Sequence, residues 1–473
     1  MIFDGMTRKE FLRRMGMVMG AISLSPLAST AAADKETEVS VVQDSPSTKM
    51  SRKQLRALES LTEKRHEARW RTRRIIKNND GNDVILAAGE VVSREMFLAK
   101  RFLGLPGTQV ETVCYCTGIT FGGHHKGKNR LLQKRFGMTR CSNELDSMGT
   151  DTLDLAVKYC HQHNIEIFWS HRMNDRHDTT PTPELMTDFK KEHPEYLIGF
   201  GSAPLSFNYA LEPVRNKFLE CCCEVVENYD IDGIELDWFR HLQFFPSVIK
   251  GGVASAEECE MMNDMMRKLR RMMDKEGLRR GRPLLLAVRV PDSREYAQGI
   301  GIDYEQWLKE DIVDLLFVND YVKLEPWKDF PPFARKYNVP AYASMEKRRL
   351  SLMDMNENGK VVGGTFEDRA RSEAYAAWLS GMDGIHTYNI DECSNELFRQ
   401  LGDPYILAEL DITPRETFCL TKSIKGMAYC NADYWLKGGR KFLKKPDRIE
   451  YVKPSNRKNN GWPNSTNDRD LNP

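Results

Sequence analysis

The chain has 473 residues and a formal net charge of +1, and hydrophobic and charged residues make up 41% and 29% of it. This composition is typical of a soluble globular protein, and the length allows one large domain with extensions or a few smaller domains. The near-zero net charge gives no global electrostatic basis for nucleic-acid binding, so no nucleic-acid partner is expected.

Residues 1–33 have the pattern of an export signal. Basic residues at the start, including Arg8 and Lys9, precede a short apolar run and a small-residue cleavage site at Ala31–Ala33. The segment T-R-K-E-F-L resembles a twin-arginine signal with Lys in the second basic position. The apolar run is too short to span a bilayer as a mature helix. We therefore expect export to the periplasm or the extracellular space and no stable membrane insertion afterwards; the alternative is an uncleaved N-terminal anchor.

Residues 34–81 predict a polar, Ser-rich linker followed by a charged helix. Leu55, Leu58 and Leu61 stand at helical spacing within this stretch. A solvated helix lying against the main domain is favoured over a binding site for an anionic partner.

From about Asp83 the pattern changes to alternating strands and helices, which is typical of parallel β/α architecture. Eight strands with intervening helices over residues 82–410 predict an α/β fold, a (β/α)8 TIM barrel. The weakest strand is the third, for which two segments compete. The expected strands are Val110–Thr117, Ile165–Ser170, either Tyr196–Phe200 or Ser206–Leu211, the stretch that enters at Asp230, Leu284–Val290, Ile312–Asp320, Val339–Met345 and Gly384–Asn389.

The remaining residues predict appendages of the barrel. Residues 411–453 hold short β-like runs, so we expect a small β-rich extension, and residues 454–473 have the composition of a disordered tail. The 11 cysteines show no zinc-type spacing, and any disulfide pairing stays open. No metal or cofactor is expected.

The stretch Y-D-I-D-G-I-E-L-D-W-F-R-H, residues 229–241, organises the domain. Side chains alternate along a strand, so Glu235 and Asp237 share the face that points into a barrel, and Trp238 lies on the face that packs against helices. Carboxylates near the C-terminal end of a barrel strand lie where barrel enzymes keep their chemistry. The alternative is a structural ion pair inside the barrel.

Polar residues gather at the expected C-terminal ends of six strands and predict a polar bowl. A tryptophan in the loop after the sixth expected strand, Trp327, is the best candidate for stacking on a sugar. The expected substrate-binding residues are His171, Arg172, Asn174, Arg240, His241, Arg289, Asn319, Asp320, Tyr321, Trp327, His386 and Tyr388.

Glycosidic bond cleavage fits this bowl best, because the leaving oxygen needs a proton and the oxocarbenium-like centre needs a carboxylate or an activated water. Asp237 is the candidate acid/base, and Glu346, at the end of the seventh strand, is the candidate nucleophile or base. Glu235 either tunes Asp237 or is itself the acid. For Glu346 the alternative is an exposed acid beside three basic residues.

The arginines of the bowl suit carboxylate or sulfate groups, which predicts an anionic poly- or oligosaccharide substrate. The alternative is that these arginines neutralise Glu235, Asp237 and Asp320.

A family resemblance agrees with this interpretation. D-G-I-E-L-D-W-F-R, preceded by N-Y-A-L-E-P-V-R-N-K-F-L, resembles the family 10-type glycosyl-hydrolase-like proteins, as does L-A-V-R-V-P followed by D-Y-E-Q-W. The resemblance spans about Val84 to Leu410 and implies a barrel and sugar hydrolysis. The central strand is also similar to the D-G-x-D-x-D-x-E strand of family 18 chitinases, but Phe239 stands in place of its catalytic Glu, so chitinase chemistry is not expected.

Two other functions compete with a glycoside hydrolase. One is a carbohydrate-binding protein on a non-catalytic barrel. The other is a metal-dependent amide or ester hydrolase that uses His124, His125, His171 and His177; the early strand lacks the H-x-H pair that such a site favours.

Overall fold

The computed structural model describes residues 51–128, 138–177, 186–200, 203–356, 360–390, 395–422, 424 and 427–451. The expected export signal, the linker up to residue 50 and the expected tail at 454–473 lie outside these residues. The chain divides into two compact units, residues 1–59 and 60–473. Helix α2 (Arg52–Arg69) begins in the first unit, and the elements that follow belong to the second.

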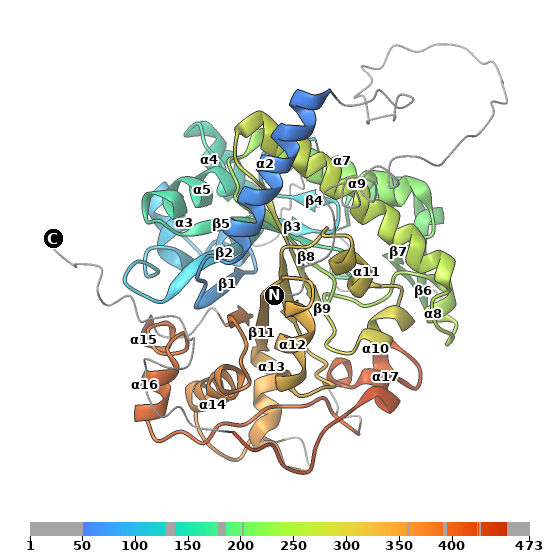
Figure 1. Cartoon of the computed structure of the whole chain (residues 1–473). Helices are drawn as coiled ribbons and strands as arrows, with labels where there is room; N and C mark the ends of the chain where they lie inside the picture. Colours follow the sequence, from blue (N-terminus) through green and yellow to red (C-terminus); the bar gives the residue numbers. More distant parts are fainter. Residues whose placement is uncertain are drawn as a thin grey trace. The chain divides into compact units, whose positions relative to one another are not determined.

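Eight parallel strands close into a barrel, which confirms the predicted (β/α)8 TIM-barrel fold (Figure 1). The strand that closes it is β1, which pairs with both β2 and β12. In order around the barrel the strands are β1 (Ile75–Asn79), β2 (Val110–Cys116), β5 (Glu166–Arg172), β8 (Gly233–Asp237), β9 (Leu285–Val290), β10 (Leu315–Val318), β11 (Ala341–Glu346) and β12 (Gly384–Tyr388).

Helices connect the strands and pack on the outer faces of the barrel (Figure 1). The longest, α9, begins at a capping box formed by Ser255 and Glu258 and ends at Gly281, whose φ of 73° only glycine adopts readily. The helices are α3 (Arg94–Arg101), α4 (Met138–Ser147), α5 (Thr152–Gln162), α6 (Asp188–Glu192), α7 (Glu212–Asn228), α8 (Pro246–Ile249), α9 (Ala256–Arg280), α10 (Arg294–Gly299), α11 (Tyr304–Lys309), α12 (Phe330–Arg335), α13 (Lys347–Leu350), α14 (Phe366–Leu379), α15 (Asn395–Phe398), α16 (Pro404–Glu409) and α17 (Ala432–Trp435).

The two faces of the central strand β8 separate as its alternation predicts. Ile234, Leu236 and Trp238 are buried in the large apolar core that the helices share with the outer faces of the strands. Gly233, on the opposite face, lies so close to β9 that a Cβ would overlap the carbonyl oxygen of Leu285. Glycine is therefore the residue that lets these two strands pair at the base of the bowl.

Two strand predictions are wrong. One barrel strand was not predicted, and the predicted third strand lies outside the barrel, so the predicted number of barrel strands is still correct. β1 lies inside the range 34–81, for which a linker and a helix were predicted, because three of its five residues (I-I-K-N-N) are polar and it directly follows Arg73 and Arg74. The two segments predicted for the third strand overlap β6 (Leu197–Phe200) and the end of β7 (Ala203–Phe207). These two strands pair with each other as an antiparallel hairpin outside the barrel.

The segment after the barrel differs from the expected β-rich extension. Among the described residues of 411–451 we find short helical turns and one isolated bridge, between Leu420 and Asn431. This segment is anchored on the barrel by a buried ion pair of 2.7 Å between Lys323 Nζ and Glu416 Oε2. Anchoring by side chains lets it stay in place without a sheet of its own.

The ten described cysteines are free thiols, and Cys393 lies outside the described residues. No helix in the described part of the chain has the length and apolar character needed to cross a bilayer.

Candidate active site

β8 brings Asp237 to the C-terminal end of the barrel interior. In the strand register, Asp237 stands opposite Arg172 of β5 on one side and Arg289 of β9 on the other. Residues that stand opposite one another on neighbouring parallel strands point to the same side of the sheet, so all three side chains enter the barrel interior at the bowl. Asp237, Glu346 and Arg289 are each at most 1% exposed.

Arg289 joins two carboxylates at the centre of the bowl. Its two Nη atoms lie 2.5 Å from Asp237 Oδ1 and 2.5 Å from Asp320 Oδ2. The guanidinium stacks on the ring of Tyr388, with its central carbon 3.7 Å from the ring centroid. Because the two Nη atoms share one carbon, Arg289 holds Asp237 and Asp320 only a few ångströms apart.

Asp320 reaches the bowl through a local break in strand alternation. Leu315 and Phe317 of β10 point inward, so regular alternation would send Asn319 inward and Asp320 outward. Asn319 instead has a φ of 80°, in the left-handed region that asparagine tolerates better than most residues. This turn exchanges the two side chains and delivers Asp320 to Arg289.

The environments of Asp237 and Asp320 differ. Asp237 accepts a hydrogen bond from the backbone N–H of Phe239 (3.0 Å), and the hydroxyl of Tyr388 lies 3.5 Å from its other oxygen. These donors and Arg289 all contact the carboxylate oxygens of Asp237. Burial raises the pKa of Asp320 well above its ordinary value; Arg289 opposes this shift, and the negative charges of Glu346 and Asp237 add to it. The two carboxyl groups therefore differ, because Asp237 is surrounded by three donor groups and Asp320 favours its protonated form.

Glu346 ends β11 and caps the following helix α13. Its Oε2 accepts hydrogen bonds from the backbone N–H groups of Arg348 (2.7 Å) and Arg349 (2.8 Å), and Asn389 Nδ2 donates to Oε1 at 3.3 Å. Burial raises the pKa of this carboxyl, and the capping N–H groups oppose the shift. Glu346 is thus buried rather than exposed, and its oxygens already serve the fold.

Arg172, at the end of β5, is paired within the protein. It forms ion pairs with Asp80 and, at 2.8 Å, with Asp175. Burial raises the pKa of Asp80, but the charges of Arg172 and Arg240 outweigh burial and lower it overall. The guanidinium groups of Arg172 and Arg289 both neutralise carboxylates of the chain itself. This favours the alternative interpretation, in which the arginines of the bowl pair with acids of the protein and do not bind an anionic substrate.

Arg240 lies across the mouth of the bowl. It donates a hydrogen bond of 2.6 Å to the hydroxyl of Tyr321, which follows β10, and its other Nη lies 2.7 Å from His177 Nε2. His241, the next residue, has Nδ1 3.1 Å from the carbonyl oxygen of Asn174 and lies at the same rim. These contacts tie the loops after three strands together above Asp237.

Four predicted substrate-binding residues do not face the bowl. His171 stacks between Phe121, Trp169 and Phe218 on the helix side of β5, because it occupies the outward register of that strand. The side chain of Asn174 is occupied by backbone groups of Phe207 and Gln243.

The other two are Trp327 and Asn319, which bond to each other. Trp327 is fully buried, so it is unavailable as a sugar platform. Its indole N–H donates to the amide oxygen of Asn319 at 2.5 Å, and the amide nitrogen of Asn319 donates to Asp292 at 2.7 Å. The left-handed turn that brings Asp320 in therefore turns Asn319 out toward this packed loop.

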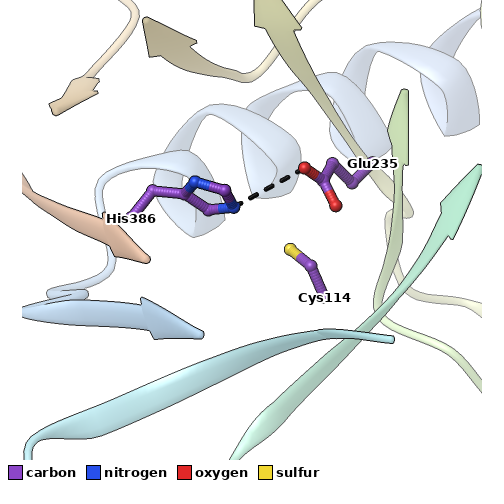
Figure 2. Close-up of side chains that lie close together, drawn as sticks. All are labelled: Cys114, Glu235 and His386. Atoms are coloured by element: carbon purple, nitrogen blue, oxygen red, sulfur yellow. Dashed lines mark ion pairs between the residues drawn. The ribbon is translucent and has the colours of Figure 1, made fainter. Parts of the chain in front are cut away.

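Glu235 lies one layer deeper than Asp237, at the floor of the bowl. His386 of β12 points toward it, with 3.6 Å between His386 Nε2 and Glu235 Oε1, and Cys114 of β2 points into the same space (Figure 2). Burial raises the pKa of Glu235 to about 7, and the opposing effect of Arg289 is not sufficient to cancel it. Glu235 and His386 thus belong to the interior beneath the bowl rather than to its rim.

Sequence reasoning did not identify Asp80 and Cys114. Asp80 follows β1, and the unrecognised strand concealed it; the signal available was I-I-K-N-N-D-G, a short apolar start that ends in a turn sequence. The histidines proposed for a metal-dependent hydrolase form no ligand group in the described part of the chain. The group found there is Cys114, Glu235 and His386.

Comparison with known proteins adds distant structural likenesses. No family model and no curated protein matches the chain, so the likeness to family 10-type proteins stays a prediction. Solved structures that are similar include an α-L-fucosidase (isoenzyme 2) from Paenibacillus thiaminolyticus, with 12% identity, a TM-score of 0.42 and coverage of 72% of this chain and 49% of that one.

Two other similar structures are also glycosidases. A family 18 N-acetylglucosaminidase from Paenibacillus barengoltzii has 12% identity and a TM-score of 0.40 over 70% of this chain and 99% of that chain. A family 36 α-galactosidase from Geobacillus stearothermophilus, in complex with 1-deoxygalactonojirimycin, has 13% identity and a TM-score of 0.37 over 75% of this chain and 44% of that chain. The chain thus spans about half the length of the fucosidase and less than half that of the α-galactosidase.

Proposed function

We propose that the protein is a glycoside hydrolase that cleaves poly- or oligosaccharides with Asp237 and Asp320. The observation that carries the proposal is the pair of carboxyl groups from different strands, with different hydrogen-bonding surroundings, held together by Arg289 at the C-terminal face of the barrel. Glycosidases need one carboxylic acid to protonate the leaving oxygen and one carboxylate on the other side of the sugar.

The roles follow from the two environments. Asp320 is the general acid, because burial and the neighbouring negative charges keep its proton on. Asp237 is the nucleophile or base, because its oxygens contact Arg289, the Phe239 N–H and the Tyr388 hydroxyl, three groups that can donate to a carboxylate. Glu346, expected to be the nucleophile or base, instead supplies negative charge that helps Asp320 to stay protonated while it caps α13.

The separation of the two carboxyl groups decides the anomeric outcome. Retaining enzymes place the two carboxyl groups roughly 5–5.5 Å apart, and inverting enzymes separate them by roughly 6.5–9.5 Å to admit a water. Arg289 contacts each carboxyl group at 2.5 Å through a different Nη atom, which keeps the pair close together and is compatible with either class. Because Asp237 and Asp320 are buried, the ties of Arg240 to Tyr321 and His177 open when a sugar enters. We place this activity outside the cytoplasm, on the basis of the signal-like residues 1–33.

A non-catalytic carbohydrate-binding barrel is the second candidate. The observation that favours it is that Arg289 already neutralises both carboxyl groups and that neither is exposed. In that case Asp237, Asp320 and Arg289 form a structural ion-pair network.

One experiment separates the two candidates. Wild type is screened for the release of reducing ends from marine, plant and bacterial polysaccharides, and the active substrate is then compared with its aryl glycoside, whose leaving group needs no proton. The proposal expects Asp320→Asn to lose turnover of the natural glycoside and to keep most turnover of the activated one. A wild type that binds a glycan without releasing reducing ends, or equal losses on both substrates, contradicts it. Asp154→Asn, on the outside of α5, is the matched control.

A further inference from the structure

The floor of the bowl is a layer of polar side chains where barrels normally hold branched apolar ones. Cys114, Glu235, Phe317 and His386 come from β2, β8, β10 and β12, the even-numbered positions around the barrel. Side chains from alternate strands form one layer of a closed eight-stranded barrel, usually of Val, Ile or Leu. All four are completely buried, and three of the four carry groups that can ligate a metal ion.

These three side chains are aimed at a common point, and two of them lack the hydrogen bonds that burial normally requires. The Sγ of Cys114, a carboxylate oxygen of Glu235 and a ring nitrogen of His386 all lie within 4.8 Å of one another. The Nε2 of His386 has no hydrogen-bond partner. The side-chain donors near Glu235 are the hydroxyl of Ser170 and the thiol of Cys114, and neither reaches full hydrogen-bonding geometry with its oxygens. Leaving buried polar groups without partners is costly, so the geometry calls for a group that all three can contact.

His386 is held in the orientation that a ligand requires. Its Nδ1 lies 2.9 Å from the hydroxyl of Ser344 on the neighbouring strand, and its ring stacks on Phe317 with centroids 4.6 Å apart. A metal-binding histidine usually has its other ring nitrogen held in this way, which fixes the ring and leaves the free nitrogen facing the ion.

The donor set and the local charge both suit a divalent cation. Thiolate, imidazole and carboxylate together are zinc ligands, with bonds of roughly 2.0–2.3 Å in a tetrahedral arrangement. The 3.6 Å between His386 Nε2 and Glu235 Oε1 is close to the separation of two ligands on one such ion. Arg289, 3.9 Å from Glu235, is the nearby cation, but it lies closer to Asp237 and Asp320, at 2.5 Å each, so its charge is shared among three carboxyl groups.

We propose that Cys114, Glu235 and His386 bind one zinc-type divalent cation at the floor of the barrel, beneath Asp237. Cys114 binds as thiolate and releases its proton to solvent. Three protein ligands leave the fourth position open on the side of the bowl. This site is independent of the glycosidase proposal, since it uses neither member of the Asp237–Asp320 pair.

Cobalt alone, used as the probe on the full chain, tests the site without any substrate. After purification in chelator, the protein is loaded with Co²⁺ both by incubation and by refolding in its presence, and metal content and absorption are measured. The proposal expects one Co²⁺ per chain, displaceable by Zn²⁺, and a sulfur-to-cobalt charge-transfer band. Cys114→Ala removes the band, whereas Cys116→Ala, two residues along the same strand and bonded through its Sγ to Gly118, keeps it.

Ser344→Ala supplies a variant that leaves all three ligands in place. Loss of a group that orients a metal-binding histidine lowers affinity about 10–100-fold, so we expect that loss here with the band retained. The proposal is overturned if wild type takes up no Co²⁺ by either route, if bound Co²⁺ gives no charge-transfer band, or if the band survives Cys114→Ala. The wild-type spectrum and Ser344→Ala decide the matter if Cys114→Ala does not fold. Absence of glycosidase activity would leave each of these outcomes unchanged.

Discussion

Arg289→Gln tests the electrostatic centre of the bowl. The substitution removes the cation that bridges Asp237 and Asp320 at 2.5 Å and leaves both carboxyl groups buried. Removing one partner of a buried ion pair typically destabilises a protein by about 3–5 kcal/mol, because an uncompensated charge stays behind. The stacking of the guanidinium on Tyr388 is also lost. We therefore expect the free energy of unfolding to fall by about 3–5 kcal/mol at pH 8, and by less at pH 5, where protonation relieves the unpaired carboxylates.

Arg267→Gln is the matched control, since Arg267 also bridges two carboxylates, Glu260 and Glu310, at 2.5 Å each. Its partners are on the outside of the protein, where such pairs contribute about 0–1 kcal/mol. Both variants and wild type are unfolded with urea at pH 5 and pH 8 in the presence of chelator. Arg289 does not neutralise a buried pair of carboxyl groups if Arg289→Gln lowers the free energy of unfolding at pH 8 by no more than Arg267→Gln does. The same conclusion holds if Arg289→Gln lowers that free energy as much at pH 5 as at pH 8.

Three further predictions concern pH, substrate charge and packing. The raised pKa of Asp320 means that its proton stabilises the folded chain below the ordinary carboxyl pKa and that this contribution is lost as pH rises through the raised value. Asp320→Asn should therefore remove both that alkaline loss of stability and the alkaline limb of the kcat/KM profile. A pH profile that keeps the alkaline limb would exclude Asp320 as the acid. Desulfation or carboxyl reduction of an active glycan should change its turnover by no more than about 3-fold, because Arg172 and Arg289 already pair with carboxylates of the chain. A loss of turnover of 10-fold or more, about 1.4 kcal/mol, would restore the prediction of an anionic substrate. Trp327→Ala should lower the free energy of unfolding by about 3–5 kcal/mol and leave the KM for a glycan unchanged, as expected for a fully buried core residue. A raised KM at unchanged stability would show that Trp327 contacts the glycan.

The sequence pattern predicted the barrel and its central strand because both depend on local periodicity. Alternation in D-G-I-E-L-D placed Glu235 and Asp237 on the inner face and Trp238 in the core, as the structure has them. β1 escaped detection because its apolar part is only Ile75 and Ile76. Strand identity there comes from pairing with β2 and β12, which a linear pattern does not contain.

The site was predictable as a set of polar strand ends but not as a set of contacts. The side to which a polar residue turns depends on single backbone angles, such as the φ of 80° at Asn319 that sends Asp320 inward and Asn319 outward. His171 and Arg172 are neighbours at one strand end, yet the first packs among aromatic rings outside the barrel and the second pairs with Asp80. Its position in the loop after the sixth expected strand made Trp327 a candidate for stacking on a sugar, and only the packing of that loop shows that Trp327 is buried.

The central claim is that Asp237 reacts with the sugar, and the most direct measurement is kcat of Asp237→Asn against wild type on the glycan found in the screen. The substitution keeps the shape of the side chain and removes its charge, so we expect kcat to fall by at least about 10²–10⁴-fold while glycan binding stays within a few-fold. Asp154→Asn should leave kcat unchanged. A folded Asp237→Asn protein with wild-type kcat would contradict the account.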